Sequence, residues 1–186
     1  MDAMELLQSR ESALKLTAPG PDDAALETIF RSAVRAPDHG RLRPWRFVVI
    51  PEARRARFGE VMAESMHRRE PDASADALQR ERDKAMRAPV IVVVAAHLQR
   101  GHKIPEIEQM ASAAAAAQTV MLAANAQGFG AMWKTGAPAY DPYVKQALGL
   151  DADDEVLGFV YLGHQVGGGS PAARPGAETH VSVWQG

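Results

Sequence analysis

The stretch from residue 106 to residue 127 constrains the fold of this 186-residue chain more than any other. After two glutamates at its start, it consists of alanines and other apolar side chains with a few uncharged polar ones. Alanine is the best helix former, so we predict a helix of about 22 residues, roughly 33 Å long. A helix that is apolar on nearly every face must be covered on nearly every face. We therefore expect a central helix, buried in the core and in part against a second copy of the chain.

The same hydropathy invites a membrane-spanning interpretation of this stretch. Glu106, Glu108, Gln118 and Asn125 argue against it, because polar groups in hydrocarbon are costly. The N-terminus has acids at positions 2 and 5 and no apolar core of signal-peptide length, so we expect no export signal. The absence of cysteine excludes disulfides and a cysteine nucleophile and fits a reducing compartment. We expect a cytoplasmic protein without a membrane partner.

Composition indicates one ordinary globular domain. Hydrophobic residues make up 46% and charged residues 24%, and this length fits one domain better than two. A net charge of −2 gives no reason to expect nucleic acid as a partner. We treat residues 1–186 as a single domain in which residues 167–186, rich in glycine and proline, form an extended tail. Val181, Val183 and Trp184 give that tail apolar side chains with which to dock.

Helices and strands alternate along the rest of the chain. Apolar residues at helical spacing and runs of β-branched residues set the positions of both. We predict further helices at about 2–9, 22–36, 53–69, 75–87 and 141–149, and strands at 45–50, 88–96, 131–133 and 156–162. Since helices outnumber and separate the strands, the predicted class is α+β with one central sheet.

Common catalytic motifs are missing. The chain has no nucleophile elbow, no His-Glu-x-x-His and no P-loop. Gly128-Phe-Gly130 lacks the third glycine of a dinucleotide fingerprint and follows a helix rather than a strand. His102 and Glu106 are four residues apart and could contact one metal, but such a pair on a surface helix is usually solvated. We predict no metal site.

Two segments carry side chains that suit an anionic ligand. Arg10 and Ser12, after the first helix, offer a cation and a hydroxyl to a phosphate, or else simply end that helix. Residues 35–47 place four arginines, a histidine and a tryptophan in a loop between a helix and a strand. This cluster suits a flat anion, with guanidinium groups for charge and planar groups for stacking. The alternative is a solvated basic loop in which Trp45 starts a core strand.

Three segments, in order, resemble the nitroreductase family, and most of all its short YdjA-type subgroup. They are Arg10-x-Ser12, then Ala36-Pro-Asp-His39 followed by Pro44-Trp-Arg-Phe47, and the helix that leads into Gly128-Phe-Gly-Ala-Met-Trp-Lys-Thr-Gly136. The similarity runs from about residue 1 to Leu162. It implies an α/β sandwich with a mostly antiparallel sheet flanked by helices, and an intertwined homodimer with two active sites at the interface.

The resemblance also implies an FMN-dependent NAD(P)H oxidoreductase. NAD(P)H would reduce the flavin and leave, after which a nitro compound, a quinone or a similar small acceptor would take its place. The flavin carries the chemistry, so no side chain is assigned a catalytic role. Two alternatives stay open: a non-catalytic dimeric module that binds flavin or another anion, and a flavin-dependent dehalogenase or ene-type reductase.

Site residues carry over from the family by position. Arg35 and His39 match flavin contacts that the family donates from the second subunit. The remaining flavin positions are Arg10, Glu11, Ser12, Trp133, Lys134 and Thr135. The positions matching a segment assigned to NAD(P)H are Ala123, Ala124, Asn125, Ala126, Gln127 and Gly128.

Four positions depart from the family pattern. Glu11 replaces an arginine, so the phosphate side loses a charge, and Lys15 stands where many members have arginine. Arg43 replaces a glutamine and Arg41 stands where many members have asparagine. The last two changes alter the polar contacts expected for the flavin ring and favour a more anionic substrate.

Overall fold

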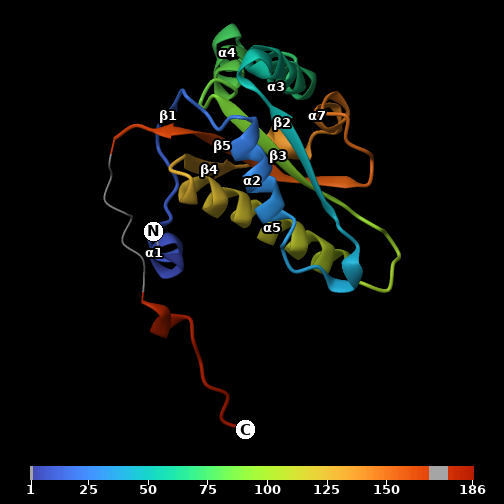
Figure 1. Cartoon of the computed structure of the whole chain (residues 1–186). Coiled ribbons are helices and arrows are strands. Elements are labelled where there is room, and N and C mark those ends of the chain that lie inside the picture. The colour runs from blue at the N-terminus through green and yellow to red at the C-terminus, as the bar shows by residue number, and fades with distance from the viewer. Residues whose placement is uncertain (1, 168–175) are drawn as a thin grey trace.

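A computed structural model describes residues 2–167 and 176–186 and shows one sheet with helices on both faces (Figure 1). The strands are β1 (Leu16–Thr17), β2 (Trp45–Ile50), β3 (Val90–His97), β4 (Gly130–Lys134) and β5 (Asp154–Gln165). The helices are α1 (Ala3–Ser9), α2 (Asp23–Ala33), α3 (Arg55–Arg69), α4 (Ala75–Lys84), α5 (Glu106–Ala126), α6 (Ala137–Tyr140) and α7 (Pro142–Ala147). Short 3-10 turns are η1 (His39–Arg41), η2 (Glu52–Arg54) and η3 (Ala177–Thr179).

All described strand pairs are antiparallel, and β5 lies at the centre of the pairing. It pairs with β3 along most of its length, with β4 in its second half, and with β1 at its last two residues. β2 pairs with the far side of β3, which gives the order β1-β5-β3-β2 with β4 beside β5. The predicted antiparallel sheet of an α+β fold is confirmed.

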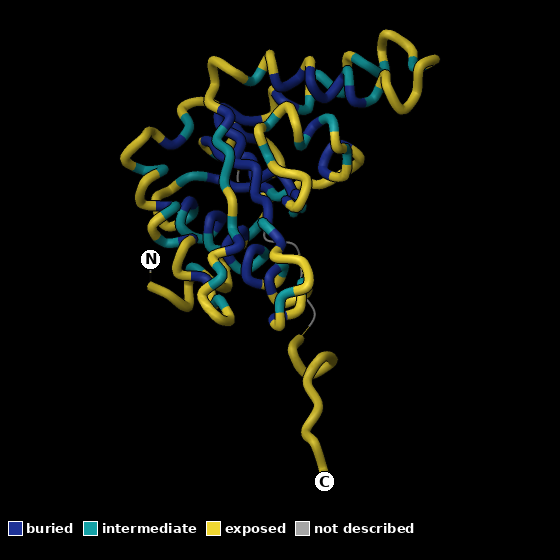
Figure 2. Tube along the Cα trace, turned by 90° about the vertical axis from the view of Figure 1, so that its right-hand side faces the viewer, coloured by how far each residue is buried: buried dark blue, intermediate teal, exposed yellow. Residues whose placement is uncertain are grey.

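The side chains of β3 alternate between the two faces of the sheet. Val92 and Val94 pack with α2 and α5, whereas Ile91 and Val93 pack with α3 and α7 on the opposite face. Because helices cover both faces, the whole strand apart from its end is buried, as the dark centre of Figure 2 shows. This explains why β3 is a run of β-branched residues rather than an alternation of polar and apolar ones.

Most predicted elements are confirmed to within a few residues. β5 is longer than predicted because its last residues pair with β1. The helix predicted at 75–87 ends at Lys84, and the chain then turns toward Pro89 and β3. β1 and α6 were not expected, because elements of two and four residues are too short to produce a periodic pattern.

The central helix α5 forms as predicted, but the described residues of one chain do not cover it on every face. Ala113, Ala117 and Val120 are among its buried residues and face the sheet and α2, while Gln109 is buried against the loop after β3. The opposite face is open, with Ile107 74% exposed and further exposed positions at Ala111 and Gln118. No described helix is long and apolar enough to span a membrane.

The described part of the tail, residues 176–186, leads away from the body of the chain (Figures 1 and 2). Val181, Val183 and Trp184 are 67%, 78% and 89% exposed, so the docking predicted for them does not occur on their own chain. Residues 168–175 of the predicted tail lie outside the described residues.

Candidate functional site

The first group of predicted residues meets at a cavity of about 200 Å³ near the C-terminal end of α5. The cavity is lined by Ser9, Arg10, Glu11, Asn125, Gly128, Phe129, Gly130 and Gln165. It therefore joins the predicted flavin segment after α1 to two residues of the predicted NAD(P)H segment. Its volume is below the roughly 300–1,000 Å³ of typical ligand pockets.

Backbone hydrogen bonds set the position of this cavity. After α1 the chain runs beside β4, where the Ala13 amide donates to the Ala131 carbonyl at 2.9 Å. Helix α5 ends where the Phe129 amide donates to the Ala124 carbonyl at 3.0 Å and the Gly128 amide to Asn125 at 2.9 Å. This pair of bonds is a Schellman helix end. The helix end and the segment after α1 are thereby held on either side of Gly130.

The cavity combines a cation with polar acceptors. The Glu11 carboxylate accepts a hydrogen bond from Gln165 Nε2 at 2.8 Å, and Arg10 is half-buried beside it. Asn125 Nδ2 donates to the Phe129 carbonyl at 2.8 Å, while Asn125 Oδ1 is buried without a partner among the described residues. Because buried polar atoms are nearly always hydrogen-bonded, this oxygen is suited to a donor from a ligand.

Trp133 is fixed at the other end of β4. Its indole Nε1 donates to the Leu157 carbonyl at 3.1 Å, and the ring lies directly against Gly158. A Cβ at Gly158 would lie 2.3 Å from that nitrogen, and its φ of +151° is one that other residues rarely adopt. Lys134 and Thr135 follow and are exposed, as is Ser12. The predicted flavin residues of this group thus lie along β4.

Arg35 and His39 form a second group, which lies elsewhere. His39 Nδ1 is 2.6 Å from Glu108 Oε2, at the N-terminal end of α5. Arg35 follows the end of α2 and is exposed. Figure 1 shows the loop with η1 at one end of α5 and α1 at the other. Glu108 and Asn125 are about 17 residues apart on this helix, which corresponds to roughly 25 Å.

This separation decides which predicted residues can share a ligand. His39 and Arg10 of one chain lie near opposite ends of α5, and His39 is not among the residues that line the cavity beside Arg10. Within one chain the predicted flavin positions therefore form two groups, one along β4 and one in the loop after α2. The contact of His39 with Glu108 could not be found from the sequence, in which the two are 69 residues apart.

The predicted NAD(P)H segment is only partly accessible. Asn125 and Gly128 line the cavity, whereas Ala124 is fully buried in the core and Ala123 is half-buried. Ala126 and Gln127 are exposed, and Gln127 Nε2 donates to the backbone carbonyl of Ala123 at 3.2 Å. Only two of the six positions thus lie where a ligand in this cavity would meet them.

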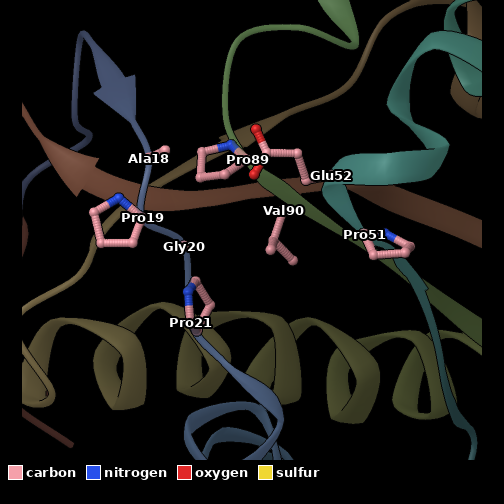
Figure 3. A pocket seen from close by; sticks show the side chains of 8 residues that line it. All are labelled: Ala18, Pro19, Gly20, Pro21, Pro51, Glu52, Pro89 and Val90. Carbon is pink, nitrogen blue, oxygen red and sulfur yellow. The ribbon is translucent and has the colours of Figure 1, made fainter.

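A larger cavity of about 620 Å³ lies apart from every predicted site residue (Figure 3). It is lined mainly by prolines and small residues: Ala18, Pro19, Gly20, Pro21, Pro51, Glu52, Pro89 and Val90. Glu52 is the one charged residue in that lining, and its carboxylate pairs with Arg55 at 2.6 Å. This lining offers no cation to a phosphate, so we place the site at β4 instead.

The side chains of His102 and Glu106 have separate partners. His102 Nδ1 accepts the Ile104 amide at 3.1 Å, and Glu106 pairs with Arg100 at 2.9 Å. Elsewhere in the described chain, His97 and Asp154 lie together with Asp151. Asp154 accepts hydrogen bonds from the Asp151 amide and lies 2.8 Å from His97 Nδ1, so these contacts tie the start of β5 to β3.

Comparison with known proteins identifies the family. The profile described as "Nitroreductase family" matches residues 7–164. The chain is 40% identical over 163 residues to "Putative NAD(P)H nitroreductase YdjA" of Escherichia coli strain K12, which covers 88% of each protein.

Solved structures show the same fold. A nitroreductase-like family protein from Bacillus cereus superposes with a TM-score of 0.87 at 21% identity, over 100% of this chain and 97% of the other. The FMN and NADPH-dependent nitroreductase NfnB of a Sphingopyxis strain superposes with a TM-score of 0.77 at 22% identity, over 100% of both chains. By the profile match and the identity to YdjA, this chain belongs to the nitroreductase family.

Proposed function

We propose that this chain is an FMN-dependent NAD(P)H oxidoreductase that reduces nitro compounds, quinones or similar small acceptors. One observation carries the proposal beyond family membership. The residues that match flavin positions form two groups at opposite ends of α5, and neither group makes a complete site. A dimer in which one copy's β4 meets the other copy's 35–43 loop would bring the two groups together.

The side chains along β4 have the chemistry that FMN requires. Arg10 and Lys134 offer positive charge to a phosphate, and Ser12 and Thr135 offer hydroxyl groups. The unpartnered Asn125 Oδ1 would accept a hydrogen bond from a hydroxyl or amide group of a ligand bound in this cavity. When bound, FMN supplies the hydride chemistry that no side chain here provides.

The protein's own contribution is to hold the side chains of the proposed site in position. Glu108 orients His39, and the Leu157 carbonyl fixes the Trp133 ring. Gln165 holds the Glu11 carboxylate with a hydrogen bond, which fixes the position of this departure from the family pattern. Arg10 lines the cavity near the C-terminal end of α5, where a positive charge is favourable beside the partial negative charge of the helix end.

Uncovered apolar surface supports the proposed homodimer. Ile107 on α5 is 74% exposed, and Met4 and Leu7 on α1 are 60% and 55% exposed. A second copy that packs along the open face of α5 and against α1 would cover these apolar side chains. We also propose that Asn125 and Gly128 are the positions of the 123–128 segment that meet NAD(P)H, and that the protein works in the cytoplasm.

The test is a flavin titration followed by turnover. The purified protein should bind FMN with a change in the flavin absorbance spectrum and should then consume NADH or NADPH when a quinone is added. Arg10→Ala should weaken FMN binding about tenfold or more, because a hydrogen-bonded charge is lost. Arg80→Ala, an exposed arginine on α4, is the matched control and should bind FMN normally.

Two results would contradict the proposal in different ways. A protein that gains no thermal stability from FMN would not be a flavoprotein. A protein that binds FMN but consumes no nicotinamide cofactor with any quinone or nitroaromatic would be the non-catalytic module instead.

A further inference from the structure

The loop after α2 holds two arginines in an unusual backbone conformation. Arg41 and Arg43 have φ values of +57° and +51°. Only a few per cent of non-glycine residues adopt positive φ, and arginine has no side-chain group that favours it locally. Such a conformation persists only where the surrounding structure fixes it, and it is common where a loop presents side chains to a ligand.

Several contacts fix this loop. Asp38 accepts two backbone hydrogen bonds, from the Leu42 amide at 3.2 Å and the Arg43 amide at 2.8 Å. Arg46 Nη1 donates to the Arg43 carbonyl at 3.0 Å. Gly40 lies directly against the buried side chain of Ile104: a Cβ added at position 40 would lie 2.2 Å from Ile104 Cδ1. The backbone of this loop is therefore fixed by Asp38 before it, by Arg46 after it and by the packing of Gly40 on Ile104.

The two guanidinium groups are left without an acidic partner in the described chain. Neither takes part in a side-chain hydrogen bond or ion pair within residues 2–167 and 176–186, and both residues are exposed. The nearby carboxylates are already used: Asp38 binds the loop amides and Glu108 binds His39. The loop thus presents uncompensated positive charge beside His39.

From these contacts the geometry points to Arg41 and Arg43 as a clamp for an anionic group of the substrate. This inference rests on the proposed function, because the loop borders the active site only if His39 reaches the flavin of a second copy. The anionic group belongs either to the 2′-phosphate of NADPH or to a carboxylate on the electron acceptor. Arginine suits both, since its planar guanidinium binds phosphate and carboxylate in a bidentate manner.

Binding of matched probes to the FMN-loaded protein tests the clamp without turnover. Calorimetry would compare adenosine 2′,5′-bisphosphate with adenosine 5′-monophosphate, and 4-nitrobenzoate with neutral 4-nitrobenzamide. In at least one pair, the native protein should bind the more negatively charged probe about tenfold more tightly than its partner. Arg41→Asn with Arg43→Asn should abolish that difference in affinity. Asparagine tolerates positive φ, so this variant is expected to fold. Added salt should weaken the native preference.

Two controls separate charge from structure. Arg41→Lys with Arg43→Lys keeps the charge but not the bidentate geometry and should retain part of the preference. Arg80→Asn on the distant α4 should retain all of it. Loss of preference for the bisphosphate alone assigns the clamp to NADPH, and loss for nitrobenzoate alone assigns it to the acceptor. The inference is overturned if the native protein shows no preference, or if the asparagine variant keeps it. Flavin binding is read separately from absorbance, so failure of the proposed function is not confused with failure of the clamp.

Discussion

Gly158 and Trp133 show how one residue type can set the position of a candidate binding side chain. The indole needs the space that a side chain at position 158 would fill, and its Nε1 needs the adjacent Leu157 carbonyl. A Cβ there would also lie 2.6 Å from the Lys134 carbonyl, a backbone atom that cannot move away easily. Position 158 therefore determines both the strand geometry and the place of the ring.

Gly158→Ala is expected to destabilise the protein by about 2–4 kcal/mol, because an unfavourable φ is combined with a clash against backbone. Gly149→Ala is the matched control: its φ is +71°, but no atom lies within 4 Å of the added Cβ. It should cost only about 1 kcal/mol. Chemical denaturation measures both. Equal losses in the two variants would show that the contact with Trp133 does not matter.

At the scale of elements, Asp141 joins α7 to α3. Its carboxylate accepts the Tyr143 amide at 2.9 Å as the cap of α7, and it binds Arg69 at 2.7 Å and the Ser65 hydroxyl on α3. Burial opposes the charge, but the Ser65, Tyr143 and Arg69 hydrogen bonds together hold the pKa of Asp141 below its usual 3.8. The ionised carboxylate therefore stabilises the folded state.

Because the pKa of Asp141 is lowered on folding, its contribution is present above pH 3.8 and is lost as the pH falls through the lower folded value. Asp141→Asn should destabilise the protein by about 1–2 kcal/mol at pH 7. The deficit should shrink as the pH is lowered below 3.8. Urea denaturation at a series of pH values measures this. Asp72→Asn, at an exposed position, is the control and should lose no stability at any pH. A loss of stability in Asp141→Asn that does not change with pH would show that the charge of Asp141 is not what stabilises the folded state.

The sequence predicted elements well where they are long, and contacts poorly where they are distant. β2 and β3 were predictable because short runs rich in aromatic and β-branched residues allow few alternatives. The Glu11–Gln165 pair was not, since 154 residues separate its members. The order of the motifs also gave no sign that His39 and Arg10 lie at opposite ends of one helix, because that depends on how the loop after α2 crosses α5.

At the scale of the whole molecule, the proposed site needs two chains. If Arg10 and the partner's His39 share one flavin, a dimer of two different variants contains one intact site and one doubly altered site. This follows from the two-fold symmetry of a homodimer, in which each site takes one group from each chain.

Arg10→Ala and His39→Ala should each bind FMN poorly alone, but mixing them under conditions that exchange subunits should restore about a quarter of native sites. The measurement is FMN bound per dimer, before and after exchange. The control is the Arg10→Ala protein alone, taken through the same exchange, and it should show no gain in FMN bound per dimer. No recovery in the mixed sample, although mixed dimers are present, would place both residues in the same chain's site.

The two residue groups are attached to one rigid helix, so the number of residues in α5 determines how far apart they lie. Each inserted or deleted residue in α5 would shift one group by about 1.5 Å and rotate it by about 100° relative to the other. The connection between α3 and α4 bears no such restriction. Length changes in this family should therefore accumulate in surface connections like that one, while α5 keeps a constant length.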